Sequence, residues 1–266
     1  MGFRVNIARI NWILSSQFGI NVYRFFSSLR GLLPFIRDWL RFRKLYHGEI
    51  RLMPCLHDRY EEGGLTKNEY FWQDLHVARW IHAAKPERHV DVGSRIDGFV
   101  AHVASFRDLE VFDIRPVTTT MPGVLFKQAD LMQSLDVETF EINDYCDSLS
   151  CLHALEHFGL GRYGDTIDQQ GYALGIKNMA SLLRQDGFFY LSTPIGKERV
   201  EFNAHRVFNP QTIIQCAAAN KLQLQKLYVI NSDGNVNQVN INDSNLHELS
   251  LAHYNLGIFI FIKNRT

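Results

Sequence analysis

The sequence of 266 residues has few cysteines, no long apolar run and no overall net charge. Its four cysteines form no CxxC pair and fit no zinc-ribbon spacing, so we expect reduced, mostly buried thiols and no metal site. No apolar run is long enough to span a membrane, because arginines interrupt the most apolar segment, near the N-terminus. Nor is there a signal peptide with a clean apolar core and a small-residue cleavage site. These absences predict a cytoplasmic protein.

The zero net charge conceals a strong asymmetry along the chain. Residues 1–51 contain nine lysines and arginines against only Asp38 and Glu49, which gives this segment a net charge of +7 and the remainder −7. Such asymmetry suggests an anionic partner for the basic segment. Nucleic acid does not fit this role, because the remainder is acidic and the basic residues lie within an apolar segment instead of a polar patch.

Residues 1–46 interleave large apolar side chains with arginines, a pattern typical of amphipathic helices. We expect Pro34 to divide the segment into at least two helices. Two interpretations stay open. The apolar face packs on its own domain or on a second subunit, as such patterns usually do, or it lies on an anionic membrane surface as a peripheral membrane contact. We therefore predict a basic, helical arm with a linker at residues 1–60 and an α/β domain at residues 61–266.

The rest of the chain alternates short apolar strands with amphipathic helices. Strands are predicted at residues 89–92, 109–112, 124–126, 145–150, 188–192, 224–230 and 256–263, and helices at 67–84, 99–106, 171–183 and 209–220. Thr66 and Glu69 form a capping box for the first of these helices, and Asn209 with Pro210 begins the last. The Asn-rich stretch 231–245 reads as a loop. This alternation predicts a doubly wound, mostly parallel α/β sheet with ligands at the carboxyl ends of its strands.

Four aspartates lie within or just after successive predicted strands: Asp91, Asp113, Asp130 and Asp147. An adenosyl or dinucleotide ligand needs a carboxylate on its ribose hydroxyls, and Asp113, after the second strand, suits that role. Asp130 suits an adenine amino group, and Asp91 a cationic part of the ligand. The turn from Gly93 to Gly98 is where we expect the backbone to approach such a ligand closely.

In this order of strands, acids and turn, residues 67–266 resemble the class I S-adenosylmethionine-dependent methyltransferases. The stretches QDLHVARWI, DVGSRIDGF, DIRP, DSLSCLHALEHFGLGRYGD and FNAHRVFNP are together similar to an uncharacterised methyltransferase-like family of unknown function, also found near bacterial surface-polysaccharide genes. The resemblance implies a seven-stranded Rossmann-like sheet with an antiparallel closing pair, S-adenosylmethionine as cofactor, and a glycan-like or small-molecule acceptor. The residues expected to bind the cofactor are Asp91, Gly93, Ser94, Arg95, Gly98, Asp113, Asp130 and Asp147.

The chain departs from the superfamily's acid-x-Gly-x-Gly-x-Gly motif after Gly93. Arg95 and Asp97 occupy the next two glycine positions, and Gly98 follows one residue late. Three roles for Arg95 stay open. Its side chain points away from the ligand, its guanidinium binds a carboxylate of the ligand, or its side chain blocks the cofactor site.

A second cluster of polar residues follows the fourth predicted strand. His153 and His157 are four residues apart, so on a helix they share a face, with Glu156 adjacent. Transfer to a hydroxyl needs a base near the attacking oxygen, and we expect His157 to be that base, oriented by Glu156, with His153 as a further catalytic candidate. Alternatively, the three side chains only hold the Gly159–Gly161 turn. They also spell His-x-x-Glu-His, the inverted-zincin signature, but that site needs a long helix and a third zinc ligand.

Five further polar residues are candidates for binding the acceptor: Arg162, Tyr163, Asp165, His205 and Arg206. In such a fold the last two return over the active-site face, and Arg206 suits an anionic group such as phosphate. Alternatively, they form only the turn that leads into the helix at Asn209.

The sequence thus predicts a methyltransferase-like protein that acts on oxygen in a glycan or glycan precursor. The alternative is a non-catalytic scaffold protein of the same fold, docked to a membrane surface or a complex by its basic arm.

Overall fold

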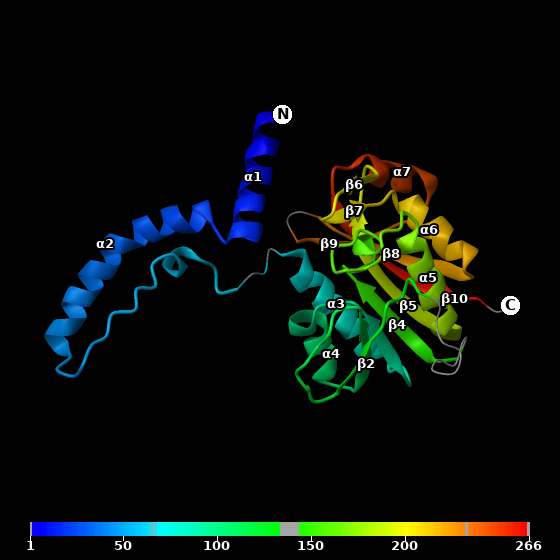
Figure 1. The fold of residues 1–266 in the computed structure, drawn as a ribbon, viewed down its shortest axis with the longest axis horizontal. Helices are drawn as coiled ribbons and strands as arrows, with labels where there is room; N and C mark the ends of the chain where they lie inside the picture. The colour runs from blue at the N-terminus through cyan, green and yellow to red at the C-terminus, as the bar shows by residue number, and fades with distance from the viewer. Residues whose placement is uncertain (1, 65, 67, 134–143, 232–233, 265–266) are drawn as a thin grey trace. The chain divides into compact units, whose positions relative to one another are not determined.

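The computed structural model describes residues 2–64, 66, 68–133, 144–231 and 234–264, with side chains from Ile10 onward. The chain divides into two compact units, Met1–Leu65 and Thr66–Thr266. Figure 1 shows the first unit in blue to cyan and the second in cyan to red.

The first unit consists of two helices and an extended segment. Helix α1 spans Gly2–Phe18, α2 spans Val22–Leu45, and the short 3-10 helix η1 spans Asp58–Tyr60. The predicted break at Pro34 is wrong, because Pro34 lies inside α2 and the helices separate at residues 19–21 instead. There Gly19 adopts a φ of 69°, and the Asn21 side chain caps α2 by accepting from the amide of Arg24. Pro34 leaves the carbonyl of Arg30, one turn earlier, without a donor, and Arg30 is exposed, so water can bond that carbonyl.

The second unit is built on one eight-stranded sheet with the order β3-β2-β1-β4-β5-β10-β8-β9. The strands are β1 His89–Val92, β2 Leu109–Asp113, β3 Val124–Gln128, β4 Cys146–Leu152, β5 Leu183–Ile195, β8 Leu222–Ile230, β9 Val236–Val239 and β10 Asn255–Lys263. Neighbours among β1 to β5 pair in parallel, whereas β10 is antiparallel to both β5 and β8. The predicted doubly wound, mostly parallel sheet and its antiparallel closing pair are confirmed.

The described part of the sheet has one strand more than the seven predicted. The extra strand, β9, lies within residues 231–245, which were predicted to be a loop, and helix α7 (Asp243–Leu251) begins there too, capped by Asn242. A separate hairpin pairs β6 (Arg199–Glu201) with β7 (His205–Val207).

Helices cover both faces of the sheet (Figure 1). Helix α3 (Glu69–Ala84), the π-helix η2 (Ile96–Val100) and the short α4 (Ala101–Ala104) pack on one face. Helices α5 (Gly171–Leu182), α6 (Pro210–Ala219) and α7 pack on the other. The cap of α6 by Asn209 is confirmed, but α3 is capped by Asn68 and not by Thr66. Lys67, the first residue of the predicted helix, lies outside the described residues.

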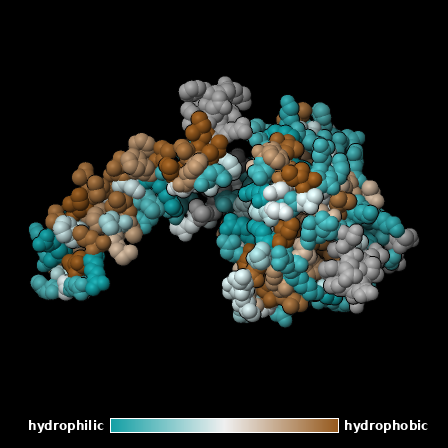
Figure 2. All heavy atoms as spheres, in the orientation of Figure 1, coloured by the Kyte–Doolittle hydropathy of each residue, from teal (hydrophilic) through white to brown (hydrophobic). Residues whose placement is uncertain are grey.

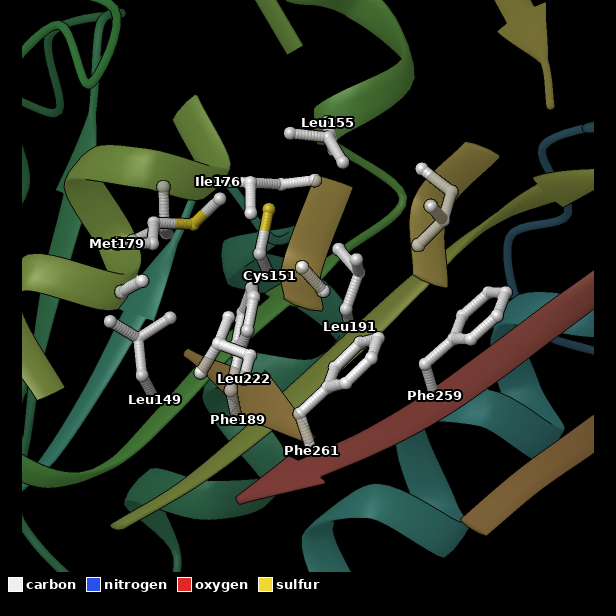
Figure 3. Packing of buried hydrophobic residues seen from close by; sticks show 14 of the residues in the cluster. Leu149, Cys151, Leu155, Ile176, Met179, Phe189, Leu191, Leu222, Phe259 and Phe261 are labelled. Carbon is white, nitrogen blue, oxygen red and sulfur yellow. The ribbon is translucent and has the colours of Figure 1, made fainter. Parts of the chain in front are cut away.

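The core alternates between the two faces of the central strands, as the two-residue period of a strand requires. On β10, Phe259 and Phe261 belong to the cluster under α5 to α7, whereas Ile258 and Ile260 belong to the cluster under α3 and α4. Figure 3 shows the first cluster, which combines Phe189 and Leu191 of β5 and the two β10 phenylalanines with Ile176 and Met179 of α5. Because β1 pairs with both β2 and β4, the strand order reverses beside it. In open α/β sheets ligands bind at the carboxyl ends of the strands at such a point.

Candidate functional site

The turn after β1 is held by a buried hydrogen-bond network around Asp91. The Asp91 carboxylate, which has no exposed surface, accepts from the hydroxyl and amide of Ser94 and from the hydroxyl of Ser150 on β4. Burial raises the pKa of Asp91 to about 7, although the hydrogen bonds oppose that shift. The Ser94 hydroxyl in turn accepts from the amide of Leu152. Asp91 and Ser94 therefore fix the shape of the turn from within.

The two predicted glycines of this turn allow close packing against protein side chains. Gly93 has a φ of 71°, and a Cβ there would lie 2.8 Å from the Cβ of Ala154 in the loop after β4. A Cβ at Gly98 would lie 2.6 Å from an oxygen of Asp74, a buried residue of α3. Gly93 thus requires glycine, because its φ is positive and the Cβ of Ala154 lies so close, whereas the contact at Gly98 is with the end of a side chain.

The side chain of Arg95 lies with its neighbours Asp97 and Tyr70. Its guanidinium donates two hydrogen bonds to the Asp97 carboxylate, at 2.7 and 3.1 Å, and its centre lies 5.7 Å from the centre of the Tyr70 ring. More than half of each charged side chain is exposed. Arg95 is therefore paired with the acid that replaces a motif glycine, and the three roles considered for it stay open.

Asp113 ends β2 at the same edge and is bound by an arginine from its own loop. Arg115 donates to both carboxylate oxygens, at 2.6 and 3.0 Å, and its amide donates to one of them. Only 8% of the Asp113 side chain is exposed, against 44% for Arg115. Asp130 follows β3, where its carboxylate accepts from the amide of Met132 and the side chain of Gln133.

Asp147 does not belong to this site, so its predicted role is wrong. It is the second residue of β4 and therefore lies at the amino edge of the sheet, opposite the other three aspartates. Its carboxylate accepts from the amides of Glu87 and Arg88 and from the side chain of Arg184. These contacts tie the start of β4 to the segment before β1, a structural role.

His153 lies buried between two carboxylates in the loop after β4. Its Nδ1 is 2.7 Å from Glu156 and its Nε2 is 3.2 Å from Glu69 of α3, while its ring stacks on Tyr70 with centroids 4.3 Å apart. Burial alone would lower the pKa of His153, but the two carboxylates outweigh burial and raise that pKa to about 9. At neutral pH His153 is therefore an imidazolium cation.

His157 is buried too, but its pKa shifts the other way. Burial lowers the pKa of His157, and nearby Arg162 adds to that shift, while Glu156 opposes it. A guanidinium nitrogen of Arg162 lies 3.2 Å from Nδ1 of His157, and Tyr163 meets the ring edge-on at 5.5 Å. The same guanidinium nitrogen lies 3.5 Å from Nε2, so this contact does not select one ring nitrogen as the acceptor, and it is the lowered pKa that makes the ring neutral at pH 7.

The predicted pairing within this cluster needs correction. Glu156 lies 2.7 Å from His153 but 3.8 Å from His157, so it orients His153. The two histidines do not share a helix face, because only Leu155–His157 forms a short 3-10 helix, η3, and His153 has a φ of 52°.

Asp165 and Arg206 hold the loop instead of facing an acceptor, so their predicted role is also corrected. The Asp165 carboxylate accepts from the amides of Gly159, Gly161 and Tyr163. Arg206 is 6% exposed and donates to the carbonyls of Glu156, Phe158 and Asp168. The Gly159–Gly161 turn is thus held by the side chain of Asp165, whereas the structural alternative had assigned this role to His153, Glu156 and His157.

His205 lies beside the His153 cluster without a direct contact to it. It begins β7, and its ring meets Tyr254 edge-on at 6.4 Å. Tyr254 in turn donates to Glu69, the partner of His153, at 2.7 Å. Burial lowers the pKa of His205.

A continuous set of contacts joins the end of β2 to the loop after β4. Asp113 binds Arg115, the Arg115 guanidinium lies 4.4 Å from the Tyr163 ring centre, and Tyr163 contacts His157. The structure therefore brings together a predicted cofactor ligand and the predicted base, although they are 44 positions apart in the sequence.

Four contributors to this site were missed by sequence reasoning: Glu69, Tyr70, Arg115 and Tyr254. A usable signal existed for α3, because Gln73 and Asp74 interrupt its core-facing side between Tyr70 and Val77, and buried polar side chains on such a face indicate a site. Arg115 lay within a stretch that carries the family resemblance. Tyr254 gave no signal, because it precedes β10 far along the chain.

Over the described ranges, no group of three or more His, Cys, Asp or Glu side chains is arranged to hold a metal ion. The His-x-x-Glu-His segment does not form the helix that a zincin site needs, since η3 covers only its last three residues.

Residues 127–254, which include the whole His153–Asp165 cluster, match a family model described as a Caenorhabditis protein of unknown function, DUF268. No curated protein matches the chain.

Several solved structures are similar in fold at low sequence identity. The N-methyltransferase NodS from Bradyrhizobium japonicum WM9 is 12% identical, with a TM-score of 0.50 over 77% of this chain and 100% of that one. A Burkholderia thailandensis 1,6-didemethyltoxoflavin-N1-methyltransferase, solved with S-adenosylhomocysteine, is 13% identical, with a TM-score of 0.49 over 73% and 79%. A TehB-like methyltransferase from Corynebacterium glutamicum is 12% identical, with a TM-score of 0.48 over 87% and 97%. The second unit therefore has the Rossmann-like fold of the S-adenosylmethionine-dependent methyltransferases.

Proposed function

We propose that this protein is an S-adenosylmethionine-dependent methyltransferase that methylates an oxygen of a glycan or glycan precursor. The observation that carries the proposal is the set of contacts from Asp113 to a neutral His157 at the carboxyl edge of the sheet. A cofactor-binding acid and a general base are needed on the same side of such a sheet.

The residues at this edge suit an adenosyl ligand. Asp113 offers a nearly buried carboxylate at the end of β2 for the ribose hydroxyls, and Asp130 a second carboxylate after β3 for an adenine amino group. The turn from Gly93 to Arg95 would lie against the rest of the cofactor. Arg115 has to release Asp113 before a ribose can bind to that carboxylate. The Arg115 side chain is half-exposed and has the Tyr163 ring as an alternative partner.

When bound, S-adenosylmethionine supplies a methyl group activated by the sulfonium, which passes to the acceptor oxygen. His157 takes the hydroxyl proton, because its lowered pKa keeps the ring neutral and a neutral imidazole has one ring nitrogen with a free lone pair. A guanidinium nitrogen of Arg162 lies within 3.5 Å of both ring nitrogens, so this exposed side chain has to yield to the acceptor. In this account Arg162 and Tyr163 line the acceptor side of the base.

His153 has a different role in the proposal. Its raised pKa makes it an imidazolium at neutral pH, so it cannot accept a proton from the acceptor. Held between Glu69 and Glu156, it ties α3 to the loop that carries His157. His153 and Glu156 are thus positioning residues. The choice of a glycan as acceptor rests on the family resemblance alone.

A non-catalytic scaffold of the same fold is the second candidate. The observation in its favour is that Arg115 satisfies both oxygens of Asp113, the position where the ribose would bind. If this ion pair is permanent, the edge cannot take a cofactor.

The proposal is tested by methyl transfer from labelled S-adenosylmethionine to glycan-containing extracts or synthetic sugars. Replacing His157 with glutamine should slow transfer by about 10²- to 10⁴-fold and leave the affinity for S-adenosylhomocysteine unchanged, because only proton removal is lost. His247→Gln, at an exposed position of α7, is the control. Because the pKa of His157 is lowered, the wild-type rate should fall only below about pH 6.5. Equal rates for wild type and H157Q would refute the role of His157.

A further inference from the structure

Helix α2 carries a continuous apolar stripe that nothing in the described part of its unit covers. The stripe consists of eight residues at helical spacing, all of them exposed: Val22, Phe25, Phe26, Leu29, Leu32, Leu33, Ile36 and Leu40. Its most exposed members, Phe25, Phe26 and Leu33, are 61%, 63% and 77% exposed. Figure 2 shows brown surface along much of α2. An exposed apolar surface of this length indicates a binding function.

The opposite side of α2 already has a partner within the same unit. Gly31 is buried against the backbone of Leu56, so closely that no larger residue would fit. Around it, Phe35, Trp39 and Phe42 line a pocket together with Cys55 and Arg59. The segment after α2 therefore packs on one side of the helix and leaves the stripe outward, so the stripe is not the internal core of this unit.

Basic side chains flank the stripe, and acidic ones are absent from it. Arg30 and Arg37 each lie one helical turn after a stripe residue, Phe26 and Leu33, and Arg41 lies one turn further on. The only acids in residues 1–51 are Asp38 and Glu49. Asp38 is on the packed side, paired with Arg59 at 2.7 Å and with Arg37 at 3.2 Å, and Glu49 is paired with Arg51.

This charge pattern decides between a second copy of the chain and an anionic surface. In a twofold contact the same patch meets itself, so the arginine flank would face arginines, and the one acid of α2, Asp38, lies on the packed side and is already paired. An anionic lipid surface supplies that charge along the whole flank and accepts the apolar stripe among its acyl chains. Helix α1 adds Ile10, Trp12 and Ile13 to the exposed apolar surface. Within the described residues, no helix is both long and apolar enough to cross a membrane.

We propose that α2 binds in the plane of a membrane rich in anionic lipid, with the stripe in the acyl region and the arginine flank at the headgroups. The proposal is independent of the proposed activity, because it uses only the first unit. Each arginine near such a surface contributes roughly a fivefold increase in affinity. Binding should therefore fall steeply with salt and with the removal of the flank.

The test is flotation of the full-length protein with vesicles of phosphatidylcholine, alone or with 30% phosphatidylglycerol as a probe of anionic lipid. We expect binding to the anionic vesicles only. Leu33→Glu, in the middle of the stripe, should reduce binding at least tenfold. The matched control is Leu45→Glu, because Leu45 is an equally exposed leucine of α2 (82%) outside the stripe. Changing Arg30, Arg37 and Arg41 together to glutamine should reduce binding by about 100-fold.

Two results would overturn the proposal. One is the absence of binding to any vesicle by a wild-type protein that circular dichroism shows to be folded. The other is equal loss of binding in L33E and L45E. Sedimentation velocity on the same samples distinguishes a contact between copies. A wild-type dimer that becomes a monomer in L33E, without vesicle binding, would assign the stripe to self-association and refute the membrane role.

Discussion

His153 and His157 are close in the sequence, but their surroundings shift their pKa values in opposite directions. His153 is held by Glu156 and Glu69 as a cation, whereas burial and Arg162 keep His157 neutral. The sequence predicted that this cluster would carry two histidines and an acid, but it could not predict which histidine the acid binds. That choice depends on the positive φ of His153, which breaks the helical spacing.

The raised pKa of His153 makes a pH-dependent contribution to stability. A histidine in the unfolded chain has a pKa near 6.5, so the folded protein holds this proton more tightly. The contribution is therefore complete below pH 6.5 and is lost as the pH rises through about 9.

Glu156→Gln tests this contribution. It leaves a buried imidazolium with one carboxylate instead of two, so the free energy of unfolding should fall by about 3 kcal/mol at pH 6.5. At pH 9.5 the loss should be much smaller, because His153 is neutral in the wild type as well. Urea unfolding at both pH values measures the difference, with Glu248→Gln, an exposed acid of α7, as the control. An equal loss at both pH values would mean that His153 is not charged in the folded protein.

At the scale of elements, the loop after β4 is the part of the second unit that organises the site. It carries His153, His157 and Tyr163, and three hydrogen bonds to the carboxylate of Asp165 fix its conformation. Arg206 of β7 also donates to backbone carbonyls of this loop. Asp165 is thus important for the site without facing a ligand.

Asp165→Ala should lower the free energy of unfolding by about 2 kcal/mol, because hydrogen bonds to a charged group are lost. It should also reduce methyl transfer while the affinity for S-adenosylhomocysteine changes little, since Asp113 is untouched. Asp168→Ala is a matched control in the same loop, because its side chain accepts only one backbone hydrogen bond, from Gln170. Thermal unfolding together with calorimetry gives both readouts, and equal effects of the two substitutions would contradict this role of Asp165.

The order of strands and helices was predictable, because each parallel strand is a short apolar run between polar turns. The residues at which the elements begin and end were less predictable. In β4 the apolar run continues to Leu152, so the sequence did not reveal that Asp147 stands at the opposite edge from Asp113. β9 and α7 lie in a polar, Asn-rich stretch, where edge pairing to β8 and a cap by Asn242 outweigh composition.

At the scale of the whole molecule, the chain combines a basic unit and an acidic one. Residues 1–51 carry a net charge of +7, and the exposed stripe of α2 lies within them. The second unit has the methyltransferase fold and the candidate site. The charge asymmetry was visible in the sequence. Which side of α2 is covered was not, because that depends on the contact of Gly31 with Leu56.

The central claim is that the carboxyl edge of the sheet binds S-adenosylmethionine with its ribose on Asp113. Isothermal titration of the full-length protein with S-adenosylmethionine and S-adenosylhomocysteine tests it most directly, with Asp113→Asn and Asp147→Asn as identical changes at opposite edges. We expect heat of binding for the wild type, a Kd at least tenfold higher for D113N because hydrogen bonds to a charged carboxylate are lost, and an unchanged Kd for D147N. No heat and no thermal shift with either compound, or equal Kd values for wild type and D113N, would contradict the account.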